Sequence, residues 1–347
     1  MLRFSKYDNP SLTLRLIIIW TQYSAMANIK IPNDWEVSEN EITPESVFMD
    51  RRKFLKGTGT IALFSAISWA GCAPSAKSGE PTTPVPFSEA EKAIYPAKLD
   101  SSYDVDGPIT PEKISSRYNN FYEFASNKED PRYDAQVLKT RPWKLEIKGH
   151  VENPGVFDMD DLYKTMPMEE RNYRLRCVEA WSMLVPWTGF PLKALIDKVK
   201  PKSSATHVAF TTFYRPFSAL GQLAFWYPWA YTEGLRIEEA MNKLTFMAVG
   251  IYGHPLPKQH GAPIRLVVPW KYGYKSAKSI ETIEFLDYQP PTFWTTAQPL
   301  EYAFEANVNP GVPHPRWSQG REKMIGTGRE RITQIHNGYG RHVAHLY

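Results

Sequence analysis

The stretch YRLRCVEAWSM, residues 173–183, contains one of only two cysteines in a chain of 347 residues. The apolar and polar residues from Arg171 to Cys177 fit a strand that ends at the cysteine. The residues that follow, with Trp181 and Trp187, are expected to form a loop. Four roles are open to a solitary cysteine at such a strand end: core residue, nucleophile, disulfide partner or metal ligand.

The neighbours of Cys177 separate these roles only in part. A cysteine in the core behaves as a small hydrophobic residue. Arg174 and Arg176 are cationic, so we expect them to lower the pKa of the thiol and to favour a thiolate, which can act as a nucleophile or as a soft metal ligand. A nucleophile needs a base, and the fold would have to bring His207 or His260 close to supply one.

Metal sites built from protein side chains alone find little support in the sequence. Zinc and iron–sulfur sites need several cysteines or a tight histidine cluster. His342 and His345 form a lone HxxH near the end of the chain, a pattern more typical of a surface than of a metal site. One thiolate is sufficient where an organic cofactor supplies the other sulfur ligands.

The second cysteine, Cys72, lies in a segment with the features of an export signal. MDRRKFLKGTGTIALFSAISWAGC begins at Met49 with a charged region, continues with apolar and small residues, and is followed by a run rich in Pro, Ser and Thr. RRKFLK resembles the twin-arginine signal, although Asp50 stands where that pattern has Ser or Thr. With Cys72 removed or lipid-modified, the mature domain has no second cysteine for a disulfide.

These features divide the chain into four parts. Residues 1–48 are an N-terminal leader. We expect translation to begin at Met26, so that residues 1–25 result from a mis-called start. Residues 49–76 are the twin-arginine signal, with Cys72 as a candidate lipid anchor. Residues 77–110 are an extended linker, and residues 111–347 form a single domain. Twin-arginine export handles proteins that fold before crossing, typically with a cofactor already inserted, so we expect a periplasmic, cofactor-loaded protein.

Composition favours a mixed fold with many loops. Aromatic residues make up 14% of the chain and prolines number 29, which suits β-rich or α+β proteins better than helical bundles. The net charge of +4 is mild and the basic residues alternate with acids, so we expect no nucleic-acid partner. GxGxxG, Walker A and HExxH motifs are missing from the sequence.

Periodicity and turn residues predict mainly strands with few, short helices. The predicted strands cover residues 143–151, 171–177, 206–212, 244–253, 262–270 and 276–288. The predicted helices cover residues 157–166, 189–201 and 236–244. This order does not follow the strict alternation of a doubly wound sheet, so the fold class is α+β.

Three motifs in the chain resemble the sulfite oxidase family of molybdopterin enzymes. They are RCVEAWSMLVPWTGFPL (176–192), HGAPIRLVVPWKYGYKSAKSI (260–280) and ANVNPGVPHPRWSQ (306–319). Within this family the chain is most similar to the catalytic subunits of periplasmic protein-methionine-sulfoxide reductases, from about residue 118 to residue 317. The resemblance implies a sulfite oxidase-type fold for residues 111–347, with a mainly antiparallel β core, short helices and one molybdenum–molybdopterin cofactor per chain.

The resemblance also implies roles for individual residues. Cys177 is implied as the thiolate ligand of molybdenum, and Glu179 shares its strand face and is a candidate proton relay. Close relatives can carry Asn at the position of His260, and either side chain can donate a hydrogen bond. The implied contacts of the pterin and its phosphate are Asn119, Tyr122, Glu123, Thr212, His260, Arg265, Ser276, Ala277 and Lys278.

The implied activity is removal of the sulfoxide oxygen from oxidised methionine residues of periplasmic proteins. The resemblance also implies a membrane-bound b-type haem subunit as the electron donor. The chain has no CxxCH motif for haem attachment, so we expect electrons to come from outside the chain. The chain also lacks room for the extra β-sandwich of dimeric sulfite oxidases, so we expect a monomer. Two alternatives stay open: a periplasmic sulfite dehydrogenase of the same family, and a non-enzymatic β-rich binding protein that keeps Cys177 in its core.

Overall fold

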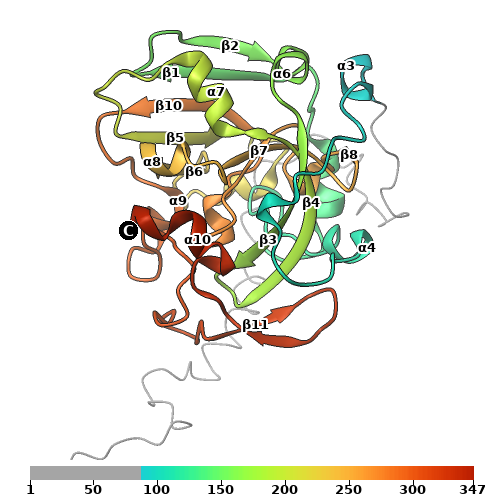
Figure 1. Ribbon diagram of the computed structural model, residues 1–347, viewed down its shortest axis with the longest axis vertical. Coiled ribbons are helices and arrows are strands. Elements are labelled where there is room, and N and C mark those ends of the chain that lie inside the picture. The colour runs from blue at the N-terminus through green and yellow to red at the C-terminus, as the bar shows by residue number, and fades with distance from the viewer. Residues whose placement is uncertain (1–86) are drawn as a thin grey trace, which may run out of the picture. The chain divides into compact units, whose positions relative to one another are not determined.

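Two β-sheets and a set of short helices make up residues 87–347, the part of the chain that the computed structural model describes (Figure 1). The longest helix in this part, α7 (Leu192–Val199), has 8 residues. This architecture confirms the predicted α+β class. None of the helices between residues 87 and 347 has the length and apolar character needed to cross a membrane. The predicted leader (1–48) and signal (49–76) lie outside the described residues.

The first sheet has five strands in the order β2–β1–β10–β5–β6. Its strands are β1 (Lys144–Gly149), β2 (Gly155–Asp158), β5 (His207–Thr212), β6 (Thr232–Arg236) and β10 (Ile280–Leu286). All neighbouring strands run antiparallel except β1 and β10, which run parallel. Burial alternates along the start of β1, where Leu145 and Ile147 face the core, as a strand covered on one face requires.

The second sheet has seven strands in the order β12–β11–β4–β7–β8, with β3 paired to β4 and β9 paired to β7. Its strands are β3 (Glu169–Cys177), β4 (Trp181–Pro191), β7 (Phe246–Ile251), β8 (His254–Pro255), β9 (Arg265–Val267), β11 (Arg321–Met324) and β12 (Glu330–Ile332). The long hairpin of β3 and β4 closes with Cys177 opposite Trp181. Cys177 is therefore the last strand residue before a tight turn.

Strand β4 corrects the prediction of a loop around Trp181 and Trp187. Both tryptophans belong to this strand and are buried. Pro186, Gly189 and Pro191 are typical of turns and obscured the strand in the sequence. Gly189 is required where β4 crosses β7, because a Cβ atom there would lie 2.0 Å from the carbonyl oxygen of Met247.

The helices are mostly one or two turns long. The α-helices besides α7 are α3 (Glu89–Lys92), α4 (Glu112–Ser115), α5 (Pro131–Asp134), α6 (Met159–Thr165), α8 (Ile237–Ala240), α9 (Phe293–Ala297) and α10 (Gly340–Val343). The 3-10 segments are η1 (Ser101–Tyr103), η2 (Ala135–Val137), η3 (Leu220–Leu223), η4 (Lys258–His260), η5 (Gly273–Lys275), η6 (Ile335–Gly338) and η7 (Ala344–Leu346). In Figure 1, α6 and α7 lie beside the five-stranded sheet.

Residues 87–110 pack on the domain, whereas the sequence indicated an extended linker from residue 77 to residue 110. Ser88 caps α3 through a capping box with Glu91, and Glu91 is itself buried. Leu99 forms a β-bridge with Glu170 at the start of β3. The linker was predicted from local composition, which carries no information on these long-range contacts.

The C-terminal part also packs on the domain. From Gly311 onward the chain forms the hairpin of β11 and β12 and then α10. His342 and His345 lie at this end. Within residues 87–347, no cluster of three or more His, Cys, Asp or Glu side chains has the arrangement of a metal site.

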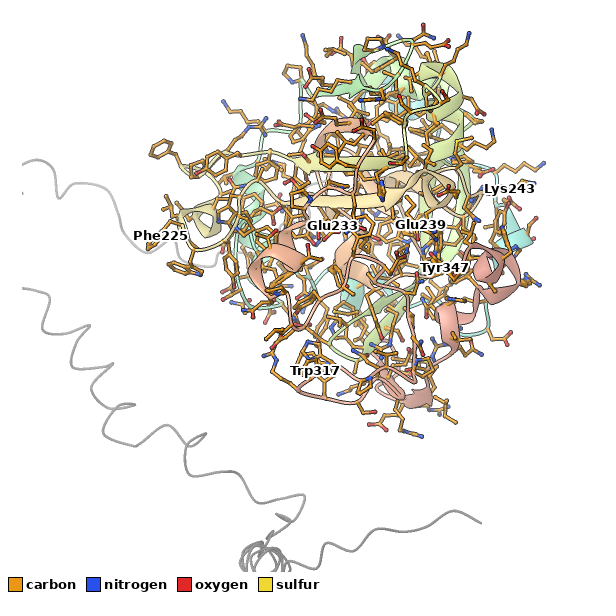
Figure 2. All side chains as sticks on the ribbon, turned by 90° about the vertical axis from the view of Figure 1, so that its left-hand side faces the viewer. Phe225, Glu233, Glu239, Lys243, Trp317 and Tyr347 are labelled. Carbon is orange, nitrogen blue, oxygen red and sulfur yellow. The ribbon has the colours of Figure 1, made fainter. Side chains whose placement is uncertain are left out.

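Two buried lysines in the domain are paired with buried glutamates. Nζ of Lys271 lies 2.6 Å from Oε1 of Glu239, and Nζ of Lys275 lies 3.0 Å from Oε2 of Glu233. Figure 2 labels Glu233 and Glu239 in the interior and Phe225 at the outer edge of the molecule. Pairing is the usual condition under which a protein buries charge.

Candidate active site

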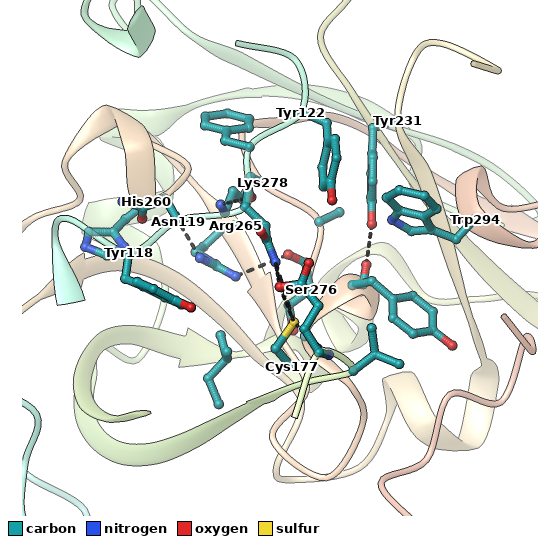
Figure 3. Close-up of a pocket in the computed structure, with 18 of the residues that line it drawn as sticks. Tyr118, Asn119, Tyr122, Cys177, Tyr231, His260, Arg265, Ser276, Lys278 and Trp294 are labelled. Carbon is teal, nitrogen blue, oxygen red and sulfur yellow. Dashed lines mark hydrogen bonds between the residues drawn. The ribbon is translucent and has the colours of Figure 1, made fainter. Parts of the chain in front are cut away.

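A pocket opens beside the end of β3, with a volume of about 830 Å³ including its mouth. Its walls come from the loop 118–123, the turn after β3, the start of β4 and the segment 260–278 (Figure 3). Ten of the eleven predicted site residues line it. They are Asn119, Tyr122, Glu123, Cys177, Glu179, His260, Arg265, Ser276, Ala277 and Lys278. Thr212 is buried at the end of β5 near Glu123 but outside the lining.

Cys177 places its sulfur at the inner end of the turn that joins β3 to β4. Its Sγ atom lies 3.5 Å from Nδ2 of Asn120, 3.4 Å from the backbone nitrogen of Glu179 and 3.6 Å from Oε2 of Glu179. Burial raises the pKa of the thiol to about 12, and the nearby carboxylate of Glu179 adds to this effect. A metal ion bound here would hold the sulfur as a thiolate.

The predicted net lowering of the Cys177 pKa is wrong: burial and Glu179 raise it by more than Arg176 and Lys128 lower it. Nε of Arg176 lies 2.7 Å from Oε2 of Glu322, so its charge is balanced away from the sulfur. The guanidinium of Arg174 donates to Gln334 and to backbone oxygens on the far side of the strand. Because these side chains point away from the sulfur and have partners of their own, the charge effect that sequence proximity predicted is outweighed by burial.

Glu179 is held by three donors at the pocket floor. Its Oε2 atom lies 2.5 Å from Nζ of Lys128, 3.0 Å from Nε1 of Trp181 and 3.3 Å from Nδ2 of Asn120. Burial raises the pKa of Glu179, but the hydrogen bonds from Lys128 and Trp181 outweigh burial and leave the pKa below its usual value. The structure therefore brings the predicted proton-relay residue next to Cys177, as an anion with fixed donors.

The turn after Cys177 is held from behind by side chains of the C-terminal region. Nε1 of Trp317 and Nε2 of Gln319 donate to the carbonyl oxygen of Val178 at 2.8 and 2.7 Å. The guanidinium of Arg176 donates to the carbonyl oxygen of Cys177 and, at 2.7 Å, to Oε1 of Gln319. These bonds fix the backbone on both sides of the thiol, so the direction of the sulfur is determined by packing.

Two cations line the pocket without a carboxylate in direct contact. Arg265 donates to the carbonyl oxygens of His260 at 2.9 Å and Ser276 at 3.2 Å, and its guanidinium lies over the ring of Trp187. Lys278 donates to the carbonyl oxygen of Asn120 at 2.5 Å. Neither forms an ion pair with a carboxylate among residues 87–347. Burial lowers the pKa of Arg265 to about 9, and burial together with Arg265 lowers the pKa of Lys278.

The surroundings of these cations fit a phosphate-bearing ligand. Two buried positive charges without direct counter-ions are the donor set that binds a phosphate group. Gly261 has a φ of +99°, and a Cβ atom there would lie 2.7 Å from Cβ of Lys278, so the glycine keeps room for the lysine. Burial also raises the pKa of Glu123 beside Lys278.

His260 fits a polar ring system in the same pocket. Its side chain is buried, and Nε2 has no hydrogen-bond partner among the described residues. Burial and the charges of Lys278 and Arg265 lower the pKa of His260 well below 6.5, so the imidazole is neutral. The buried histidine with a free nitrogen, the thiol and the two cations without ion pairs therefore fit a molybdopterin, which offers polar ring atoms, a metal and a phosphate.

Sequence reasoning missed the pocket residues that are aromatic or that neighbour a predicted one. Asn120 adjoins the predicted Asn119 and is the amide that reaches the sulfur. The aromatic lining residues gave no signal in the sequence, because composition does not distinguish a core wall from a pocket wall. The missed lining residues are Tyr118, Asn120, Phe121, Leu175, Val178, Trp181, Met183, Tyr231, Gly273, Tyr274, Trp294 and Tyr302.

Comparison with known proteins agrees with this fit. Residues 132–294 match a protein family described as the oxidoreductase molybdopterin binding domain, which places the domain in this class of enzymes. The chain is 45% identical over 336 residues to the protein-methionine-sulfoxide reductase catalytic subunit MsrP of Burkholderia mallei, covering 96% of this chain and 97% of that protein. The chain belongs to the family of protein-methionine-sulfoxide reductase catalytic subunits.

A solved structure also aligns with the chain. The sulfane dehydrogenase SoxCD from Paracoccus pantotrophus aligns with a TM-score of 0.44 and 17% identity, over 74% of this chain and 66% of that one.

Proposed function

We propose that this protein is a molybdenum-dependent reductase of methionine sulfoxide residues in periplasmic proteins, with one molybdopterin cofactor per chain. The observation that carries the proposal is the pocket itself, in which a single buried thiol lies among residues that include two unpaired buried cations. Cys177 would hold the metal, and Arg265 and Lys278 would hold the phosphate. His260, Ser276 and Asn119 would contact the pterin, with Tyr122, Glu123, Thr212 and Ala277 as further predicted contacts.

The reaction removes one oxygen atom from sulfur. The S=O bond breaks, the sulfur accepts two electrons and becomes a thioether, and the oxygen leaves as water after taking up two protons. The bound cofactor supplies the two-electron oxygen-atom transfer, while the protein supplies ligation, orientation and hydrogen bonds.

The side chains around Cys177 have distinct tasks in this reaction. Asn120 and the backbone N–H of Glu179 donate toward the sulfur and fix its direction. Lys128 and Glu179 form a fixed polar pair at the floor of the pocket, where protons have to arrive. Tyr122 and Trp294 lie edge to face, with centroids 5.2 Å apart, and form an aromatic wall suited to a thioether.

Electrons would come from outside the chain. A membrane-bound b-type haem subunit suits this role because the chain carries no haem-attachment motif and its signal resembles the twin-arginine type. A subunit relationship is also indicated by the name of the Burkholderia mallei relative, which is a catalytic subunit. The resemblance of residues 49–76 to a twin-arginine signal supports a periplasmic location, with Cys72 as a candidate lipid anchor.

The test compares methionine sulfoxide, which a reductase would reduce, with sulfite, which a sulfite dehydrogenase would oxidise. Molybdenum-loaded protein should oxidise a reduced viologen dye when methionine sulfoxide peptides are added, and it should not reduce an oxidised dye when sulfite is added. Turnover with sulfite alone would make the protein a sulfite dehydrogenase. Turnover with neither substrate and a protein without molybdenum would favour the non-enzymatic binding protein.

A further inference from the structure

A row of aromatic side chains connects the outer surface with the pocket. Phe225, at the outer edge in Figure 2, is 88% exposed, and its ring lies 5.3 Å from that of Trp226. Trp226 lies 6.2 Å from Tyr227, and Tyr227 lies 6.1 Å from Trp294. Trp294 stacks on Tyr302 at 4.9 Å, and both line the pocket. Burial increases from Phe225 to Trp294, and Tyr302 at the end of the row is half-buried.

A groove lies in front of the pocket and shares its walls. Its volume is about 870 Å³ including open solvent. The residues that line it are Tyr122, Glu179, Tyr227, Trp294, Gln298, Glu301, Tyr302, Arg316 and Trp317. Tyr122, Glu179, Trp294 and Tyr302 line both the groove and the pocket, so the groove lies directly beside the surroundings of Cys177.

Residues 214–226, which we name the apolar loop, extend this groove outward through Tyr227. Arg215 is the only charged residue of the loop, and it pairs with Glu281. Six large apolar side chains of the loop are exposed: Tyr214, Phe217, Leu220, Leu223, Phe225 and Trp226. A contiguous exposed apolar surface of this kind marks a binding site.

The groove fits a polypeptide better than a lipid surface. Besides its aromatic side chains, the groove is lined by Gln298 and by the ion pair of Glu301 and Arg316, whose atoms lie 2.7 Å apart. Glu179 lies at its inner end. Hydrocarbon chains would desolvate these carboxylates without compensation, whereas a polypeptide offers amide groups to the polar side and apolar side chains to the aromatic side.

We propose that the groove and the apolar loop bind the polypeptide on either side of the oxidised methionine, and that Phe225 and Trp226 make the enzyme select methionine sulfoxide flanked by apolar residues. The inference rests on the proposed function, since it assigns the residues that surround the sulfoxide rather than the chemistry. Phe225 and Trp226 act as specificity residues: they contact the flanking segment and not the reacting atoms.

Two short peptides with a central methionine sulfoxide provide the test, one flanked by Leu and Phe and one flanked by Ser and Gly. The ratio of their kcat/KM values is measured with molybdenum-loaded enzyme and a reduced viologen dye. Because two partly exposed aromatic side chains lose their contacts, Phe225→Ser combined with Trp226→Ser should lower this ratio about tenfold. Val156→Ser on β2 replaces an exposed apolar residue that does not line the groove and should leave the ratio unchanged.

Binding measurements separate this inference from the proposed chemistry. The same peptides with methionine sulfone in place of the sulfoxide are titrated calorimetrically, and the wild type should bind the apolar peptide more tightly. Equal ratios and equal affinities in the wild type and the double variant would overturn the inference. Loss of binding to phosphatidylglycerol vesicles in the double variant, with an unchanged peptide ratio, would also overturn it and make the loop a membrane contact. Failure of the wild type to reduce any sulfoxide, with selective sulfone binding intact, would count only against the proposed function.

Discussion

At the scale of single residues, the two cations of the pocket differ from the two buried lysines outside it in the groups that they contact. Lys271 and Lys275 lie against buried glutamates. Arg265 and Lys278 donate to main-chain carbonyl groups instead. A buried charge without a partner opposes folding, so two of them in one pocket are best explained by an anionic ligand that binds there.

Replacing Lys278 and Lys271 should therefore have different effects. Lys278→Met removes a buried charge that forms no ion pair, with only the electrostatic influence of Glu123 nearby, so the cofactor-free chain should lose less stability than with Lys271→Met, while molybdenum content should fall at least about tenfold because the phosphate loses a charged donor. Lys271→Met leaves Glu239 buried without its lysine and should destabilise the chain by about 3 kcal/mol. Denaturant unfolding and metal analysis check both variants. An equal loss of stability in the two variants would contradict this view of Lys278.

His260 predicts how the cofactor-free protein responds to acid. Its imidazole stays neutral in the folded state because its pKa lies well below 6.5, whereas the unfolded chain binds a proton as the pH falls through 6.5. The unfolded state then holds more protons, so stability present above this pH is lost on acidification, at up to about 1.4 kcal/mol per pH unit. His260→Asn should remove this part of the slope. The measurement is the free energy of unfolding at a series of pH values, and parallel slopes in the two proteins would refute the assignment.

The sequence was sufficient to find most of the pocket but not its electrostatics. The motifs that contain Asn119, Cys177 and Lys278 are far apart in the chain, and only the resemblance indicated that they converge. The pKa of the Cys177 thiol was predicted with the wrong sign, because burial and the directions of Arg174 and Arg176 are decided by tertiary packing. The aromatic walls of the pocket were not predicted for the same reason.

At the scale of elements, the hairpin of β3 and β4 positions the thiol, and the C-terminal region holds the hairpin's turn. Strand β3 was predicted from its pattern and confirmed, whereas β4 was hidden by prolines and a glycine that are tolerated within this sheet. The contact of Gln319 with Val178 joins segments about 140 residues apart and could not be inferred from local sequence.

Gln319→Leu should loosen this turn. The substitution leaves the carbonyl oxygen of Val178 with one donor fewer and the guanidinium of Arg176 without one of its acceptors, and each lost bond to a buried group costs about 1 kcal/mol or more. We expect a loss of about 2 kcal/mol in the free energy of unfolding and a lower molybdenum content. Gln298→Leu, at an exposed position, should change stability by less than about 0.5 kcal/mol and serves as the control. Equal stability of the two variants would show that the turn does not depend on Gln319.

At the scale of the whole molecule, both sheets contribute residues to the pocket. Strand β3 delivers Cys177 from the seven-stranded sheet, and the segment that leads into β10 delivers Ser276 and Lys278 beside the five-stranded sheet. The α+β class followed from composition and periodicity, but the pairing of β1 with β10, which are far apart in sequence, did not. The monomeric state and the division of the chain before residue 87 stay predictions.

Export of the full chain should depend on the paired arginines after Met49. Replacing Arg51 and Arg52 with lysine keeps the charge but removes the side chains that the twin-arginine pattern requires. The variant should accumulate in the cytoplasm with its cofactor inserted, whereas the wild type should reach the periplasm. Cell fractionation followed by immunoblotting measures the distribution, with Lys53→Arg as the matched control. Equal export of wild type and variant would exclude the twin-arginine route.

The most direct test of the central claim is the molybdenum content of the purified domain from cells supplied with molybdate. Mass spectrometry of the metal should give about one molybdenum per wild-type chain, since one thiol and one phosphate site define one cofactor position. Cys177→Ala should retain little or none of the metal while its unfolding transition shows an intact fold. A wild-type protein without molybdenum, or a Cys177→Ala variant that retains it fully, would contradict the account.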